Sequence, residues 1–293
     1  MMQNLNYGVI GNCRSAALIS QTGSLEWLCL PKFDSPSIFA KILDNDKGGS
    51  FEFILDDDYR FSQTYIRKTN IQVTKVWNEA HQFEIVDFMP RYITEKGYHY
   101  LPPDVIRYIK HQKGKPAFRV KYVPKLEYAK YPTKTEIFND YIKSYTTKGP
   151  YDSIYLYTDF DKEKVVNGYR LEITEDAFFL LSYNQKILPQ SADREYLKLQ
   201  RTKVYWLNWS ERTKLFGKYN DEILRSALVL KLLSCHHSGA VLAAVTTSLP
   251  ETIGDVRNSA YRYCWLRACS MAIEVMTELS HSHVARRYFK FIR

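Results

Sequence analysis

The stretch FRVKYVPKLEY, residues 118–128, decides between sheet and helix for the first part of the chain. Apolar and charged side chains alternate along it: Val120, Tyr122, Pro124, Leu126 and Tyr128 stand between Arg119, Lys121, Lys125 and Glu127. A period of two residues is typical of a strand with one buried face, because successive side chains point to opposite sides of a sheet. We therefore expect a strand here, with its charged side chains on a solvated face.

Similar short runs of β-branched and aromatic residues, separated by turn residues, continue to residue 183. The candidate strands cover residues 17–19, 25–30, 50–54, 71–77, 83–88, 118–122, 154–157, 169–173 and 177–183. Helical apolar periodicity is scarce between them. We expect an N-terminal antiparallel β-sandwich domain over residues 1–190.

The pattern becomes helical after residue 190. A linker helix, capped by Asp193 and running through Trp209, is expected within residues 191–220. Residues 221–293 then predict one helix that Gly239 ends, one over residues 261–279 and one that begins near His283. The fold class is thus β + α multidomain, although periodicity alone also fits a helical bundle for the last part.

Composition narrows the class of protein. A chain of 293 residues with 45% hydrophobic residues and 23 tyrosines has enough apolar surface for one large or two moderate folded domains. It has no basic and apolar leader and no run of about 18 apolar residues, so we expect a cytoplasmic protein outside the membrane. The odd set of cysteines, without a CxxC pair, predicts buried thiols and neither a disulfide framework nor a metal site.

The formal charge of +9 raises the hypothesis of an anionic partner. Residues 107–125 hold seven basic side chains and no acidic one. Four further basic residues lie near the C-terminus: Arg286, Arg287, Lys290 and Arg293. The strand pattern favours a solvated sheet face for the first group, so nucleic acid is not the expected partner.

Residues 243–272, AAVTTSLPETIGDVRNSAYRYCWLRACSMA, are the candidate functional segment. They combine a turn-rich loop, which offers hydroxyls and backbone donors, with the flat rings of Tyr261, Tyr263 and Trp265. Sugars bind to flat apolar faces that are flanked by fixed hydrogen-bonding groups. The alternative is that these rings pack a helix into the core while Arg262 and Arg267 pair with acids elsewhere.

Six motifs along the chain resemble family 15 glycoside hydrolases of the glucoamylase and trehalase-like type. They are IGNCRSAALIS (10–20), GSLEWLCLPKFDSPSIFAKILD (23–44), DFMPR (87–91), SALVLKLL (226–233), TTSLPE (246–251) and RNSAYRYCWLR (257–267). The first three resemble the β-sandwich domain that precedes the catalytic barrel in bacterial members, and the last three resemble the start of that barrel. The resemblance therefore covers nearly the whole chain.

This resemblance implies a fold, a reaction and a site. The fold is a β-sandwich, a linker and a barrel of six α-hairpins. The reaction is inverting hydrolysis of an α-glucosidic bond, in which one carboxylic acid protonates the leaving oxygen and one carboxylate activates water. No metal or organic cofactor is implied, and the partner is an α-glucoside or glucan. The motif residues Tyr261, Trp265 and Arg267 would contact the non-reducing glucose.

Two departures from the family pattern weaken this expectation. The family usually has Trp-Asp where this chain has Ser259 and Ala260, and Arg-Asp where it has Arg267 and Ala268. The methyl group of Ala268 cannot accept a hydrogen bond, and each buried sugar hydroxyl left unpaired costs about 1–3 kcal/mol. We therefore expect weak glucose binding.

No residue of the chain is assigned as catalytic. The acids that follow the TTSLP run are Glu251, Asp255, Glu274 and Glu278, and none has a matching catalytic context. Glu274 and Glu278 are one helical turn apart, which is typical of a solvated helix face.

The helical part is also short for a barrel. Twelve helices with their connections need on the order of 200 residues, whereas residues 221–293 supply 73. We expect a truncated barrel that exposes apolar side chains, which predicts either poor solubility or a need for a partner chain that covers them. The expected exposed set is Ile223, Leu224, Leu228, Val275 and Met276.

Three hypotheses follow. The chain is a truncated or degenerate glycoside hydrolase that is inactive alone, or part of an active α-glucosidase that a second chain completes. The third alternative is a non-catalytic β-sandwich module that binds or assembles with a carbohydrate or an anionic partner.

Overall fold

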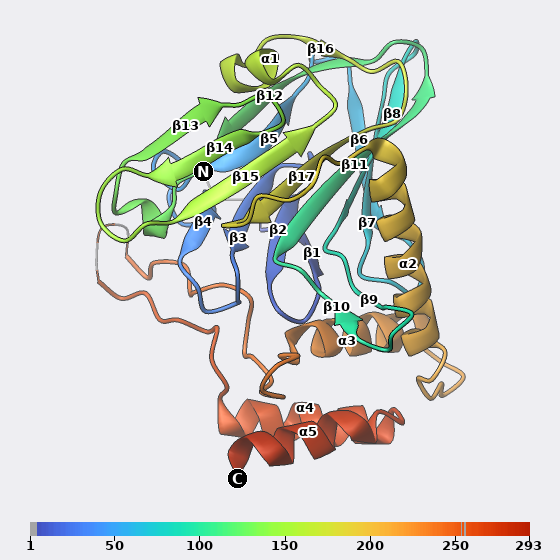
Figure 1. Cartoon of the computed structure of the whole chain (residues 1–293). Coiled ribbons are helices and arrows are strands. Elements are labelled where there is room, and N and C mark those ends of the chain that lie inside the picture. The colour runs from blue at the N-terminus through green and yellow to red at the C-terminus, as the bar shows by residue number, and fades with distance from the viewer. Residues whose placement is uncertain (1–4, 253, 255) are drawn as a thin grey trace.

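Two antiparallel sheets packed face to face make up most of the computed structural model, which describes residues 5–252, 254 and 256–293 (Figure 1). The first sheet has the strand order β1-β2-β3-β5-β12-β16, and β4 pairs with β3 beside this path. Its strands are β1 (Tyr7–Gly11), β2 (Ala16–Ser20), β3 (Leu25–Cys29), β4 (Ser37–Ala40), β5 (Ser50–Ile54), β12 (Ala117–Val123) and β16 (Leu171–Glu172).

The second sheet has the order β13-β14-β15-β17-β11-β8-β7-β6. Its strands are β6 (Arg60–Tyr65), β7 (Gln72–Trp77), β8 (Gln82–Phe88), β11 (Asp104–Lys113), β13 (Thr133–Ile137), β14 (Ile142–Thr146), β15 (Ser153–Thr158) and β17 (Ala177–Tyr183). Between β8 and β11 the chain forms a small hairpin of its own, β9 (Tyr92–Ile93) and β10 (His99–Tyr100). The expected antiparallel β-sandwich is confirmed.

Aromatic rings from both sheets fill the space between them. Phe51 on β5 and Phe179 on β17 meet across the sandwich, edge to face, with ring centroids 5.2 Å apart. Phe118 on β12 joins the same cluster through Phe53, at 5.0 Å. Such pairs add about 0.5–1.5 kcal/mol each to the stabilisation from area burial. The apolar side chains of the opening stretch thus point into the core, and its alternation correctly predicted β12.

The centre of the second sheet is buried on both faces. Its outer face carries Phe178 and Leu180 of β17, which belong to one hydrophobic cluster with Leu199 and Trp206 of helix α2 (Ala192–Ser210). A strand that is covered on both sides reads as a continuous apolar run without alternation. This accounts for the sequence AFFLL at the start of β17.

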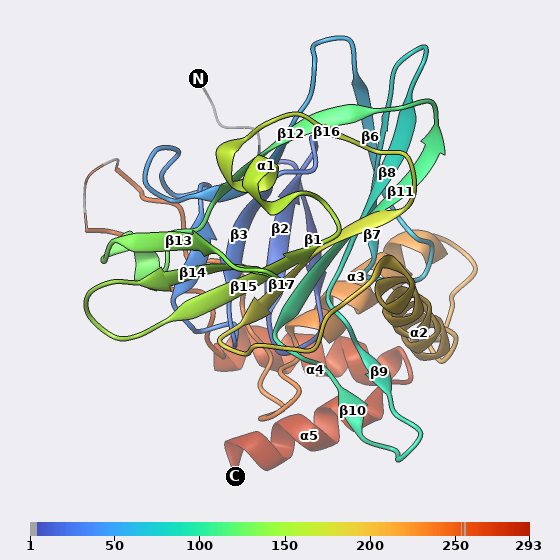
Figure 2. The same ribbon diagram turned by 45° about the horizontal axis from the view of Figure 1, so that its top comes forward.

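The remaining helices lie at one end of the sandwich. They are α3 (Asn220–Leu233), α4 (Leu266–Glu278) and α5 (Ser282–Ile292), while the short α1 (Lys162–Asn167) lies at the opposite end (Figure 1). Figure 2 shows α2 and α3 beside the second sheet, with α4 and α5 below both. In the part of the chain that the structure describes, no helix is both long and apolar enough to cross a bilayer.

Several local expectations are corrected. The opening stretch leaves the sheet after Val123, because Pro124 has no N–H for the ladder and residues 127–129 turn with φ of 52–58°. Ser191, not Asp193, caps α2, since its hydroxyl accepts a hydrogen bond from the Arg194 N–H at 3.4 Å. Gly239 does not end α3, which stops at Leu233.

Gly239 has a different role. It lies in a turn with φ of 87°, and a Cβ atom there would come within 2.6 Å of the Arg287 carbonyl oxygen on α5. The missing side chain therefore allows the α3–α4 connection to lie against α5.

The expected exposed apolar set is wrong in part. Leu224, Leu228 and Met276 are buried, because they belong to the cluster that packs on the outer face of the second sheet. Val275 is exposed as expected. The basic residues 107–125 are likewise not all on a solvated face, since Arg107 is completely buried.

Candidate functional site

Residues 243–252 and 256–263 form the two sides of an irregular loop between α3 and α4. The Ala244 N–H donates to the Tyr261 carbonyl at 3.0 Å, and the Ser248 N–H donates to the Ser259 carbonyl at 2.7 Å. Thr247 and Ala260 form an isolated antiparallel bridge. Because this pairing uses the backbone of residues 259–263, α4 cannot begin at Tyr261 and begins at Leu266 instead.

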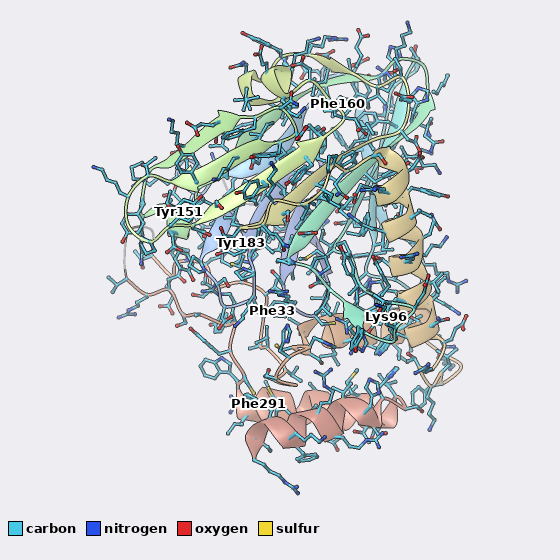
Figure 3. All side chains as sticks on the ribbon, viewed as in Figure 1. Phe33, Lys96, Tyr151, Phe160, Tyr183 and Phe291 are labelled. Atoms are coloured by element: carbon cyan, nitrogen blue, oxygen red, sulfur yellow. The ribbon has the colours of Figure 1, made fainter. Side chains whose placement is uncertain are left out.

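Arg262 attaches this loop to the sandwich. Its guanidinium is buried and donates to the Ser35 carbonyl at 2.8 Å and to the Tyr128 hydroxyl at 2.9 Å. It also donates to the carbonyl of Phe33, which Figure 3 marks at the end of the sandwich that faces the helices. The expectation that Arg262 pairs with an acid is therefore wrong: carbonyl and hydroxyl oxygens accept its hydrogen bonds.

Trp27 provides a second attachment. Its indole N–H donates to the Val245 carbonyl at 2.8 Å, and the Arg262 guanidinium lies 5.8 Å from its ring centroid. The neighbouring Cys29 thiol, 3.5 Å from Arg262, stays protonated because burial raises its pKa to about 12. The candidate segment is thus attached to the sandwich on both sides of the loop, at Val245 through Trp27 and at Arg262 through its own guanidinium.

Tyr261 and Trp265 lie together on the surface. Their ring centroids are 6.4 Å apart with an interplanar angle of 60°, and the side chains are 40% and 53% exposed. The core-packing alternative for these two rings is therefore wrong. Their exposed faces form an open aromatic platform of the kind on which a sugar ring can stack.

Arg267 lies on the first turn of α4, two residues beyond Trp265. Its side chain is exposed, and it makes no hydrogen bond or ion pair with any residue that the structure describes. Ala268 is exposed beside it. An exposed guanidinium keeps its water, so the absence of a local carboxylate carries little desolvation cost here.

The acids of this region do not form a pair that is held in place for catalysis. Glu251 is exposed and lies 3.6 Å from the exposed Arg257. Glu274 and Glu278 are exposed on α4, and Asp255 lies outside the described residues. Among described residues, no group of three or more His, Cys, Asp or Glu is placed to hold a metal ion.

A large cleft lies elsewhere and was not predicted from the sequence. It has a volume of about 1260 Å³ and is bounded by the β9–β10 hairpin, α2 and α5. None of Tyr261, Trp265 and Arg267 lines it. Its residues come from four separated parts of the chain. Arg91 and Lys231 lie in the motifs DFMPR and SALVLKLL, but neither motif shows that the two side chains line one cleft.

The fold defines a β-sandwich protein with an attached helical region that carries an exposed pair of aromatic rings. The chain belongs to the family described as trehalase-like, N-terminal, whose profile matches residues 5–160. This match covers most of the two sheets.

Similarity to full-length trehalases extends further along the chain. The trehalase of Thermoplasma volcanium is 31% identical over 291 residues, which is 96% of this chain and 46% of the relative. That of Thermoplasma acidophilum is 32% identical, over 92% of this chain and 46% of the relative. The Mycobacterium tuberculosis trehalase is 28% identical, over 98% and 45%. The chain thus spans about half the length of these curated relatives.

Proposed function

We propose that this chain is the sandwich and first helical part of a trehalase-like glycoside hydrolase, and that it holds one glucosyl unit of an α-glucoside at Tyr261, Trp265 and Arg267. The observation that carries the proposal is the exposed pair of rings on a loop fixed by Arg262 and Trp27. A rigid support lowers the entropy lost when a sugar stacks on the rings.

The proposed binding is weak. Arg267 offers guanidinium donors to sugar hydroxyls, but Ala268 offers no acceptor beside it. The platform is open to solvent on one side. A polar ligand then keeps part of its hydration and gains little from each hydrogen bond.

The chain alone is proposed not to hydrolyse glucosides. Inverting hydrolysis needs two carboxyl groups on opposite sides of the scissile bond, about 6.5–9.5 Å apart. All three glutamates of this region are exposed. Glu251 lies in the loop that carries the platform, and Glu274 and Glu278 lie on α4. None of the three lies in a closed, desolvated site of the kind that a general acid occupies.

A partner polypeptide is the third part of the proposal. The domain division of residues 1–190, 191–220 and 221–293 would make α3, α4 and α5 the start of a six-hairpin barrel. α4 and α5 pack as a pair, and an apolar groove of about 650 Å³ between them includes the exposed Leu266 and Phe289. Further barrel helices with apolar faces would cover this groove.

The test is binding and hydrolysis of trehalose, maltose and isomaltose by the purified chain. Weak binding and no release of glucose are expected. Trp265→Ala should abolish binding, whereas Tyr263→Ala, the matched control in the same loop, should keep it. Ala268→Asp should strengthen binding, because it restores an acceptor. Glucose release by the unmodified chain would contradict the proposed inactivity.

Two finer points belong to the same proposal. The cysteines of the described chain are free thiols, which suits a reducing compartment such as the cytoplasm. The alternative function is a non-catalytic module for a carbohydrate or an anionic partner. Adding a second chain that carries the later helices of a relative distinguishes these two functions. Glucose release should appear only if this chain is part of a glycoside hydrolase.

A further inference from the structure

The cleft between the β9–β10 hairpin, α2 and α5 has an unusual charge pattern. Figure 3 marks Lys96, which lies at the turn of this hairpin. The cleft is lined by six Lys or Arg side chains: Arg91, Lys96, Arg201, Arg212, Lys231 and Arg287. Glu95 is the sole acid among the described residues that line it. The cleft therefore carries a net positive charge, with one carboxylate against six cations.

Arg91 is a buried cation at the inner wall of this cleft. It is 1% exposed and donates to the Asn12 carbonyl, and its guanidinium lies 4.8 Å from the Tyr205 ring centroid. Its Nε has no hydrogen-bond partner among the described residues. A buried guanidinium without a carboxylate partner is costly unless a ligand supplies the negative charge.

Lys231 is a second buried cation at the same wall. It lies in the last turn of α3 and is 4% exposed, and no ion pair joins its ammonium to a carboxylate in the described chain. Burial first, and then Arg91 and Arg287, lower the pKa of Lys231 to about 8. At neutral pH it still holds its proton, so it adds to the unbalanced charge.

The histidines at the wall are neutral in the absence of a ligand. Burial and the charge of Arg91 lower the pKa of His236 to about 3, and the pKa of His99 is lowered for the same reasons. The two rings are 4.6 Å apart, and Arg287 donates to the His236 carbonyl. Neutral imidazoles can donate one hydrogen bond each to an anion.

Aromatic rings form the other side of the cleft. Tyr92, Tyr98, Tyr100, Tyr205 and Trp209 all line it. The Arg201 guanidinium lies 5.5 Å from the Tyr92 ring centroid. Tyr98 is 71% exposed at the entrance. A volume of about 1260 Å³ is far larger than one phosphate needs, and the rings offer flat faces for the rest of a ligand.

We propose that this cleft binds a phosphorylated sugar, with the phosphoryl group at Arg91, Lys231 and Arg287 and the sugar ring against the tyrosines. A phosphate dianion balances two to three cations and accepts the fork of donors that a guanidinium presents. A neutral glucoside would leave Arg91 and Lys231 without a counter-charge. The cleft is separate from the platform of Tyr261 and Trp265, so the proposal does not depend on the function proposed above.

The experiment is calorimetric titration of the full chain with glucose 6-phosphate, inorganic phosphate and glucose at about 0.1 M salt, where exposed charges are screened. Glucose 6-phosphate should bind at least about tenfold more tightly than inorganic phosphate, because the rings add stacking contacts. Glucose should not bind in the cleft. Equal affinities for the two phosphate probes would overturn the sugar part, and no binding of either would overturn the whole proposal.

Variants assign the binding to the cleft. Lys231→Met should weaken both phosphate probes at least about tenfold, the loss expected for one charge-assisted contact. Tyr98→Ala, at the exposed entrance, should weaken glucose 6-phosphate alone. Lys148→Met, an exposed lysine on the β14–β15 turn, is the matched control and should change neither. Binding that survives Lys231→Met would overturn the site, and Trp265→Ala should leave it intact.

Discussion

Arg107 on β11 and Asp87 on β8 form a completely buried ion pair, with the guanidinium Nε 2.8 Å from a carboxylate oxygen. The two residues are direct partners in the sheet register. Arg107 also donates to the Phe51 carbonyl of the first sheet at 2.9 Å and to the Gly23 carbonyl, and its guanidinium lies 4.9 Å from the Phe51 ring centroid. One cation thus connects both sheets through the core of the sandwich.

Removal of this cation is expected to destabilise the sandwich strongly. Arg107→Met leaves Asp87 buried without a counter-charge and leaves two carbonyls without donors. Breaking a buried pair in this way costs about 3–5 kcal/mol. The measurement is urea unfolding followed by fluorescence. Arg119→Met on β12 is the control, since Arg119 is exposed, and its effect should stay within about 0.5 kcal/mol. Equal effects of the two variants would contradict the role of Arg107.

Arg262 is expected to hold the candidate sugar loop on the sandwich. Arg262→Ala removes the donors to Ser35, Phe33 and Tyr128, and should release residues 243–263 while the sheets stay folded. Limited proteolysis should then cut this loop much faster, and amide exchange should rise there. Arg267→Ala, an exposed arginine five residues further on, should leave both rates unchanged. An unchanged loop in Arg262→Ala would show that Trp27 suffices.

The sandwich was predictable because its strands carry local signals. The candidate strands at residues 50–54 and 177–183 coincide with β5 and β17. The central strand β11 was missed, since its sequence DVIRYIKHQK mixes basic and apolar residues and reads as a charged stretch. The burial of Arg107 is explained by Asp87, which lies opposite it on β8 and balances its charge. A buried ion pair has no local sequence signal.

The site was predictable to a lesser degree. The motif around Tyr261 and Trp265 identified two rings that do lie together, because neighbouring residues of one loop stay neighbours in the fold. The cleft with Arg91 and Lys231 was not predicted. These residues are separated by 140 positions in the chain, and the motifs that contain them give no local sign that the two side chains meet. Only the packing of α3 against the sandwich brings them together.

Asp104 should make stability depend on pH. Burial raises its pKa to about 6, although the Ser182 hydroxyl, Lys198 and Arg14 oppose this rise. The folded state therefore holds this proton more tightly than the unfolded chain. The contribution of the Asp104 proton to the free energy of unfolding is complete below about pH 4 and is lost as the pH rises through about 6. At pH 7 the loss amounts to up to about 3 kcal/mol, since one pKa unit corresponds to about 1.4 kcal/mol.

Asp104→Asn tests this directly. The variant should match the unmodified chain at pH 4 and become more stable than it above pH 6, measured by chemical unfolding at both pH values. Asp46→Asn, at an exposed turn, serves as control and should show no such difference. A constant gap between the Asp104→Asn variant and the unmodified chain at all pH values would contradict the raised pKa.

Lys231 should oppose folding at neutral pH. Burial, followed by the charges of Arg91 and Arg287, lowers its pKa to about 8, so the folded state holds its proton less tightly than the unfolded chain does. Its contribution to stability is present above about pH 10 and is lost as the pH falls through about 8. The cost at pH 7 amounts to up to about 3 kcal/mol.

Lys231→Met should therefore be more stable than the unmodified chain at pH 7, and the gain should shrink towards pH 10. Lys218→Met, on an exposed loop, should show neither effect. The same Lys231→Met variant is expected to lose the phosphorylated ligand, so stability and binding would change in opposite directions. A merely structural lysine would lower stability when removed. A gain in stability on removal is instead expected for a cation of a ligand site. A bound anion supplies the counter-charge that the Lys231 ammonium lacks, so the free energy that this cation costs the unliganded fold is recovered when the anion binds.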